Sequence, residues 1–228
     1  MGKDISKTVD QARSSWVLSY GDMVTLLITF FIMMITVSAG QIDKIHAWVN
    51  SRLDEAAVEI QAAMVDAQIE EISVSRNSKG VQITLKDPRL FETASAQPRN
   101  SHIYQLDAVA RSIQNLNIFN LEDTKHFPFL KELKSSGLQW LVEIKIEGHT
   151  DDMRLTRNAL YRDNWELSAA RAQSIMIQLQ DRTALPPSIF AIAGFGEFQP
   201  IGDNNTQSGR EINRRVEIYI GASLVKKI

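Results

Sequence analysis

The sequence has no cysteine and almost no excess of charge of either sign. Without cysteine the chain cannot form disulfides, thiolate metal sites or a cysteine nucleophile. Its 25 Lys and Arg residues stand against 27 Asp and Glu residues, a formal net charge of −2. Proteins that bind nucleic acid usually carry a clear basic excess, so nucleic acid is not expected as the main partner. The 228 residues suffice for one globular domain and an appendage.

Long apolar runs are also absent, with one exception near the N-terminus. Residues 16–38 read WVLSYGDMVTLLITFFIMMITVS, and Asp22 is the one charged residue among them. As a helix this run would be roughly 34 Å long, enough to cross a bilayer core of about 30 Å. We therefore predict a transmembrane helix at 16–39. A cleaved signal peptide is the competing interpretation, since residues 37–39 resemble a cleavage site, but the apolar run is long for one.

The short N-terminal segment at 1–15 predicts the orientation of this helix. It contains Lys3, Lys7 and Arg13, and basic residues favour the cytoplasmic side of a membrane. We therefore expect a single-pass protein of the inner membrane, with a cytoplasmic N-terminus and a large C-terminal part in the periplasm.

Asp22 carries the strongest functional implication in the apolar run. A carboxylate near the centre of a membrane helix costs on the order of 2.5–3.5 kcal/mol, so such residues usually face protein or water. Ser19, Thr25 and Thr29 fall on the same helical face as Asp22. A polar stripe on one helix implies partners inside the membrane. Two interpretations stay open: Asp22 reaches the headgroups at the interface, or it binds a proton or cation in a conduction path.

Residues 40–71 are predicted to form a helical connector. From residue 41 the segment has neither proline nor glycine. Its apolar residues recur at three- and four-residue spacing: Ile42, Ile45, Val49, Leu53, Ala56, Ile60, Ala63, Met64 and Ala67. This thin seam is compatible with pairing to a second copy, with lying on a membrane surface, or with a solvated linker. As a helix, thirty residues reach about 45 Å.

Beyond residue 71, short strand patterns alternate with helix patterns. Strands are predicted at 72–75, 81–86, 142–147, 189–195 and 215–220, and helices at 104–116 and 164–180. An irregular, charged insertion is expected at 121–137. The alternation predicts an α+β fold, a two-layer α/β domain at 72–221 followed by a tail at 222–228.

Four motifs stand in order along this predicted domain. They read IEGHTD at 146–151, NWELSAARA at 164–172, GFGE at 194–197, and NT…GR…NRRVEI between 205 and 218. The series resembles the OmpA-like peptidoglycan-binding domain. The upstream LFETASA at 90–96 is similar to a further motif of that family, with alanine where glycine is common.

The apolar run has a resemblance of its own. Trp16, the stretch YGDMVTLL at 20–27 and the pair FF at 30–31 are similar to the membrane helix of MotB/PomB-type stator subunits. That family joins such a helix to an OmpA-like domain, so the similarity covers nearly the whole chain. Gly21 replaces a common alanine. The connector is shorter than is usual in the flagellar family, whose longer segment includes a plug region, so a plug role for 40–71 stays open.

The OmpA-like resemblance implies a set of wall-binding residues. Asp151 and Arg171 would clamp the diaminopimelate of the wall peptide, Asn164 would bond the peptide, and one of Arg214 and Arg215 would help to hold a carboxylate. The chemistry is suitable, because a carboxylate meets an ammonium and a guanidinium binds a carboxylate with two parallel bonds. The alternative is that Asp151 and Arg171 form an internal salt bridge.

Neither catalysis nor a metal site is expected. His149 has no second histidine at ligand spacing, so we interpret it as structural. No nucleophile–base pair and no phosphate-binding loop stands out in the sequence, so the chain is not predicted to be an enzyme, and no cofactor is expected apart from a transported ion.

The stator resemblance implies ion-driven motility. Two copies of the chain, as a homodimer, would sit inside a ring of a multi-pass MotA/PomA-type partner, five copies around two. Asp22 would bind and release a proton or a sodium ion along a path lined by Thr25 and Thr29. Three functions follow in order of preference: a flagellar stator subunit acting in motility and chemotaxis, a related motor with another client such as phage defence, or a passive cell-wall tether.

Overall fold

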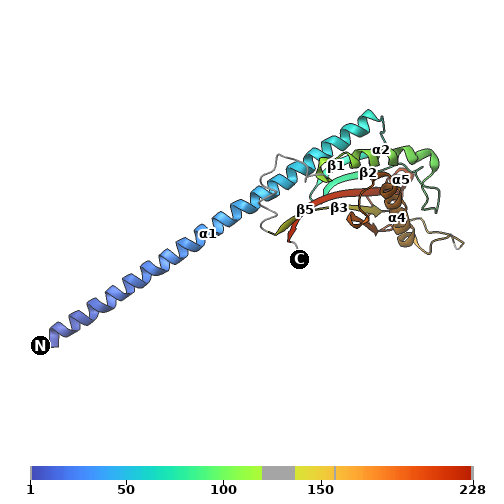
Figure 1. Ribbon diagram of the computed structural model, residues 1–228. Helices are drawn as coiled ribbons and strands as arrows, with labels where there is room; N and C mark the ends of the chain where they lie inside the picture. Colours follow the sequence, from blue (N-terminus) through green and yellow to red (C-terminus); the bar gives the residue numbers. More distant parts are fainter. Residues whose placement is uncertain (1, 120–136, 157, 227–228) are drawn as a thin grey trace. The chain divides into compact units, whose positions relative to one another are not determined.

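The computed structural model describes residues 2–119, 137–156 and 158–226 (Figure 1). The predicted insertion at 121–137 therefore lies outside the described residues except for Gly137. The chain divides into two compact units, Met1–Trp48 and Val49–Ile228, which are taken in turn.

The first unit is entirely helical where it is described and belongs to helix α1 (Gly2–Asp66). Its apolar stretch, Trp16–Thr36, has 21 residues and a mean hydropathy of 1.8, and none of it is buried. By length and composition this stretch can cross a membrane. Within the described chain the residues of this stretch are exposed, except Val24, which is partly exposed, and this is typical of a helix that spans a membrane.

The last part of α1 belongs to the second unit and forms part of its core. Leu53, Ala56, Ile60 and Met64 are at most 4% exposed and pack in the same cluster as the sheet. The sequence-based boundary at residue 72 thus differs from the structure, in which the compact unit starts at Val49. The part of the apolar seam from Val49 to Met64 packs in one core with the domain's own sheet, a role that none of the three interpretations of the connector included.

The end of α1 explains how the chain turns back into the sheet. Gln68 adopts φ 55°, a left-handed conformation. The N–H of Ile69 donates to the carbonyl of Met64 at 3.1 Å, and Ile69 is itself buried. This bond and the left-handed residue are the features of a Schellman-type helix end, with a glutamine in the position usually held by glycine.

The second unit contains one five-stranded sheet. Its strands are β1 (Ile72–Asn77), β2 (Gly80–Leu85), β3 (Leu138–Gly148), β4 (Phe190–Gly194) and β5 (Val216–Lys226), in the spatial order β1-β2-β5-β3-β4. All neighbours are antiparallel except β3 and β4. Strand β5 continues to Lys226, which pairs with Leu138, so residues 222–226 of the predicted tail are part of the sheet.

Helices complete a two-layer domain. They are α2 (Ile103–Gln114), α4 (Asn164–Thr183) and the short α5 (Gln207–Asn213), with 3-10 turns at Asn100–His102, Asn117–Phe119 and Pro187–Ile189. Helix α4 connects the parallel strands β3 and β4 and packs on both, and α2 packs on α4. The predicted α+β fold with one N-terminal apolar helix is confirmed. Helix α5 was not predicted.

Candidate functional site

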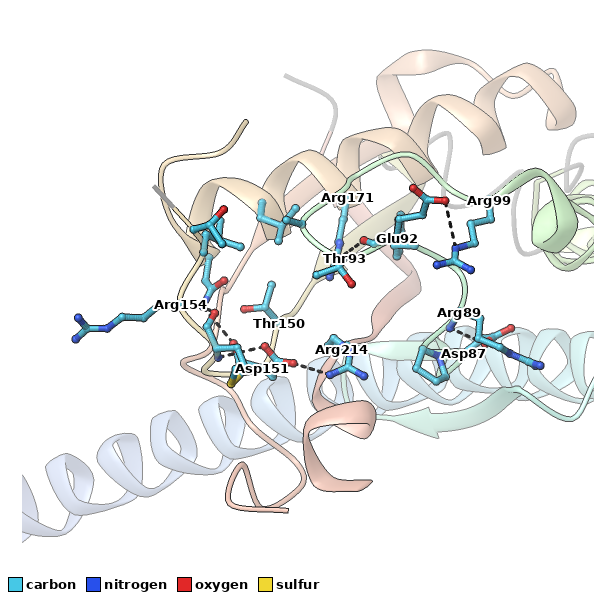
Figure 2. Close-up of a pocket in the computed structure, with 18 residues that line it drawn as sticks. Asp87, Arg89, Glu92, Thr93, Arg99, Thr150, Asp151, Arg154, Arg171 and Arg214 are labelled. Atoms are coloured by element: carbon cyan, nitrogen blue, oxygen red, sulfur yellow. Dashed lines mark hydrogen bonds and ion pairs between the residues drawn. The ribbon is translucent and has the colours of Figure 1, made fainter. Parts of the chain in front are cut away.

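The second unit contains a pocket of about 420 Å³ at the C-terminal end of β3 and the start of α4 (Figure 2). Its lining comes from four regions: Asp87, Pro88, Arg89, Phe91, Glu92, Thr93, Ala94 and Arg99 from the loop after β2; Thr150, Asp151, Met153, Arg154, Leu155 and Thr156 from the loop after β3; Asn164, Leu167 and Arg171 from α4; and Arg214 from the end of α5. Five of these residues are arginines, against three acids. The pocket is therefore suited to a ligand that carries a carboxylate.

A glycine sets the position of the loop after β3. A Cβ at Gly148 would lie 2.0 Å from the backbone oxygen of Ser168, so only glycine lets α4 pack this closely on the strand. The backbone N–H groups of His149 and Thr150 then donate to the carbonyls of Arg215 and Gly196, at 3.0 and 2.9 Å. These bonds hold Asp151 at the pocket wall.

Asp151 is buried and paired. Its Oδ2 accepts a bond of 2.6 Å from Arg214, and its Oδ1 accepts one of 3.2 Å from the N–H of Met153. In the described part of the chain, Asp151 therefore forms its ion pair with Arg214 and not with Arg171, unlike the internal salt bridge considered from sequence. Figure 2 shows Asp151 facing Arg214 across the lower part of the pocket.

Arg171 reaches the pocket from α4 and is held by backbone. Its Nε donates to the carbonyl of Ser95 at 2.9 Å, and its guanidinium lies 4.8 Å from the ring centre of Phe91. Burial lowers the pKa of Arg171 to about 10, which leaves it charged at neutral pH. Among the described side chains no carboxylate lies within ion-pair distance of it, so its charge is available to a ligand.

The wall formed by LFETASA contains a strained residue. Ala94 adopts φ 55°, in the left-handed region where residues with a Cβ pay about 1–2 kcal/mol. This is the position at which the sequence has alanine in place of the commoner glycine. The wall places Ser95 and Phe91 against Arg171.

Asn164 begins α4 and bridges three parts of the site. The N-cap Asp163 accepts a bond from the N–H of Glu166, whose carboxylate accepts one from the N–H of Arg162, an arrangement close to a capping box. The Asn164 amide donates to the carbonyl of Asp151 at 3.2 Å and to Glu197 Oε2 at 2.6 Å. Because its amide is already bonded within the protein, Asn164 mainly positions the neighbouring residues of the pocket.

Arg215 does not line this pocket. It is 4% exposed and donates to Glu217 at 2.6 Å, so the structure separates it from Arg214, its neighbour in sequence. Of the five residues expected to bind the wall, the pocket brings together Asp151, Asn164, Arg171 and Arg214.

His149 lies outside the pocket, in a buried polar cluster. It stacks on Phe195 with ring centres 5.3 Å apart, and burial together with the charge of Arg215 lowers its pKa to about 4. Glu147, His149 and Glu217 could each offer a ligand atom to a metal. Lys145 already lies 2.7 Å from Glu147, and Arg215 bonds Glu217. These cations balance the carboxylates, so the donor set favours a structural role, which stays a prediction.

Sequence reasoning missed the acid at the other end of the pocket. Asp87 is buried and accepts bonds from the N–H and side chain of Arg89 and from Gln105. Burial alone would raise the pKa of Asp87, but these bonds outweigh it and lower the pKa. The only signal in the sequence was its position directly before Pro88 and the LF motif.

The second group of predicted residues lies in the first unit. Asp22, Thr25 and Thr29 are exposed on α1. The Thr25 hydroxyl donates to the backbone carbonyl of Asp22 at 2.8 Å, and that of Thr29 to Leu26 at 2.9 Å. Such bonds satisfy the hydroxyl donors within the helix itself, as an apolar medium requires. The hydroxyl oxygens can still accept a hydrogen bond or contact a cation.

Comparison with known protein families gives two matches. The model described as the OmpA family matches residues 128–214, and the model described as membrane MotB of the proton-channel complex MotA/MotB matches residues 3–51. The first match includes most of the pocket, and the second includes Asp22. The two matches correspond to the predicted C-terminal domain and to the predicted membrane helix with its flanking residues.

Individual proteins agree with these matches. The chain is 28% identical to the uncharacterized protein YtxE of Bacillus subtilis over 93% of its own length and 90% of that protein. It is 28% identical to Motility protein B of the same organism over 75% of its length and 57% of that protein. The crystal structure of a MotB-like protein from Desulfovibrio vulgaris matches 77% of this chain and 94% of that one, with a TM-score of 0.59 and 21% identity, a likeness of fold.

Proposed function

We propose that this chain, which joins a MotB-type membrane segment to an OmpA-like domain, is the wall-anchored B subunit of an ion-driven rotary motor. One observation carries the proposal: a single acid in an exposed apolar helix and a pocket lined by Asp151 and Arg171 occur on the same chain. Motors need a moving charge and a fixed point, and these two features are suited to supply one each.

At the membrane end, Asp22 is proposed to carry the ion. Protonation or sodium binding neutralises its carboxylate, and release restores a charge that needs water or a donor. The difference can shift a multi-pass MotA/PomA-type partner between two packings. The gradient supplies about 2.3 kcal/mol per charge for each 100 mV. Thr25 and Thr29, one and two turns further on, are proposed to line the path of the ion.

At the other end, the pocket is proposed to hold the diaminopimelate of the peptidoglycan peptide. Asp151 would receive the ammonium, and Arg171 the carboxylate, with Arg214 adjusting between its bond to Asp151 and the ligand. With the domain fixed in the periplasm and the N-terminus in the cytoplasm, two copies of the helix would stand still while the partner ring turns around them.

The test exchanges Asp22 in cells that also carry the partner. Swimming and ion entry would be recorded for Asp22→Asn, for the conservative Asp22→Glu, and for Met33→Ala as a control on the same exposed apolar stretch. We expect the asparagine variant to assemble but to lose both ion entry and swimming, and Met33→Ala to keep both.

Each other result has a definite meaning. Loss of ion entry without any change in swimming would keep the motor and assign it a client other than the flagellum. Unchanged ion entry in the asparagine variant would overturn ion conduction through Asp22 and leave a passive tether to the wall.

A further inference from the structure

Two large aromatic side chains are exposed beside the pocket. Trp165 is 52% exposed and Phe198 is 66% exposed, and their ring centres lie 5.2 Å apart with a tilt of 48°. Aromatic rings usually bury most of their surface, and exposed aromatic side chains in contact are typical of a binding surface. We propose that Trp165 and Phe198 form a sugar-stacking platform for the glycan to which the wall peptide is attached. This inference rests on the wall-binding role of the pocket.

The platform is tied to the pocket on both of its chain segments. Asn164 and Glu197 precede Trp165 and Phe198 directly, and the two are joined by the bond of 2.6 Å already described. Consecutive Cα atoms are about 4 Å apart, so each ring starts one residue away from this bridge. The platform therefore begins one residue from Asn164, which lines the pocket, on one segment, and one residue from Glu197, which bonds Asn164, on the other.

The backbone around the two rings is fixed by close packing. Gly196 adopts φ 54°, and a Cβ there would lie 3.3 Å from the backbone nitrogen of Trp165. Its N–H donates to Ser168 Oγ on α4, while its carbonyl accepts from Thr150 in the pocket wall. Trp165 itself is the second residue of α4, after the N-cap Asp163 and Asn164. The backbone that carries the two rings is therefore pre-organised, which reduces the entropy lost when a ligand binds there.

The chemistry of the wall selects a sugar as the occupant. One face of a pyranose ring presents several C–H bonds, which are attracted to the negative face of an aromatic ring. In peptidoglycan the diamino acid is the third residue of a peptide that starts on the lactyl group of N-acetylmuramic acid. Two residues and the lactyl group span about 10 Å when extended. A peptide held by Asp151 and Arg171 thus keeps its sugar within reach of a surface beginning beside Asn164.

Calorimetry with two ligands tests the inference on the full chain in detergent. One ligand is a sugar-free stem peptide containing diaminopimelate, and the other is the same peptide on its N-acetylglucosamine–N-acetylmuramic acid disaccharide. We expect the native chain to bind the disaccharide peptide at least five-fold more tightly. Trp165→Ala and Phe198→Ala should abolish this gain and leave the affinity for the sugar-free peptide unchanged.

Two further variants separate stacking from other effects. Trp165→Leu keeps an apolar side chain without a ring and should lose the gain like alanine, whereas Trp165→Phe should restore part of it. Ile177→Ala is the matched control, since it removes a side chain of similar exposure, 44%, from the same helix. It should keep the full gain.

The alternatives give different results. If the native chain binds both ligands equally, or if Trp165→Ala weakens both equally, the platform is overturned while the pocket role stands. If Trp165→Ala changes the oligomeric state in sedimentation and neither affinity, the pair is an interface between copies and the inference is overturned. If the native chain binds neither ligand, the proposed wall anchoring itself fails.

Discussion

Helix α1 contains two apolar stretches that differ in what covers their apolar side chains. Residues 16–36 expose apolar side chains on every side, and none of them is buried. Residues 49–66 expose most of their surface but bury one stripe, Leu53, Ala56, Ile60 and Met64, against the sheet. The first stretch is exposed within the described chain, whereas the second packs against the sheet of the same chain. Substitutions should therefore affect function in the first stretch and stability in the second.

The largest effect on stability is expected from Ile60→Ala. Ile60 is fully buried, and truncating such a side chain costs about 2–5 kcal/mol through lost burial and a residual cavity. Val58→Ala on the same stretch, where Val58 is 70% exposed, should cost less than about 0.5 kcal/mol. Chemical denaturation of the full chain in detergent measures both. Equal effects of the two variants would show that this stretch is a solvated linker in solution.

The two regions also differ in the surroundings of their functional aspartates. Asp22 is exposed, whereas Asp151 is buried and bonded to Arg214. Asp151→Asn removes one charge of the pair and the group proposed to meet an ammonium, so it should weaken binding to diaminopimelate peptide about 100-fold, or about 2.7 kcal/mol. Asp152→Asn, at the exposed neighbouring position, is the control. Similar losses in both variants would point to a general effect of charge.

Acid should destabilise the second unit through His149. Its pKa is about 4 in the folded chain and about 6.5 when unfolded, because burial and the charges of Arg215 and Lys79 outweigh the attraction of Glu217. The unfolded state therefore binds the proton more readily. The free energy of unfolding is highest above pH 6.5, where His149 is neutral in both states, and it decreases as the pH falls towards 4. Between pH 7 and pH 5 the free energy of unfolding should fall by about 2 kcal/mol. This fall is measured as the difference from His149→Gln, and a difference independent of pH would contradict the prediction.

The fold was predictable because its signals are local. The alternating strand at 142–147 and the amphipathic helix at 104–116 correspond to β3 and α2, since periodicity reports the buried face directly. The pairing of the seam at 49–66 was not predictable in this way. An apolar stripe indicates that a helix is covered, but the covering partner, here the sheet of the same chain, is a property of tertiary structure.

The candidate site was predictable at the positions that match motifs of a known family. Asp151, Asn164, Arg171 and Arg214 line one pocket as their motifs implied. Sequence reasoning left open which of Arg214 and Arg215 would serve, because the two are adjacent; in the structure Arg214 lines the pocket and Arg215 is buried beside Glu217. It also missed Asp87 and the exposed pair Trp165 and Phe198, because exposure and pairing arise only when distant segments meet.

The smallest effect is expected at the pocket wall, where the second unit tolerates strain that its core compensates. Ala94 is held in a left-handed conformation that costs a residue with a Cβ about 1–2 kcal/mol. Ala94→Gly removes that strain but gives the unfolded chain more freedom, so the net gain in unfolding free energy should be about 0.5–1 kcal/mol. Ala62→Gly, at an exposed position inside α1, should instead lose about 1 kcal/mol. Opposite signs for the same substitution would locate the difference in backbone conformation, whereas a loss at both positions would mean that Ala94 is not strained in solution.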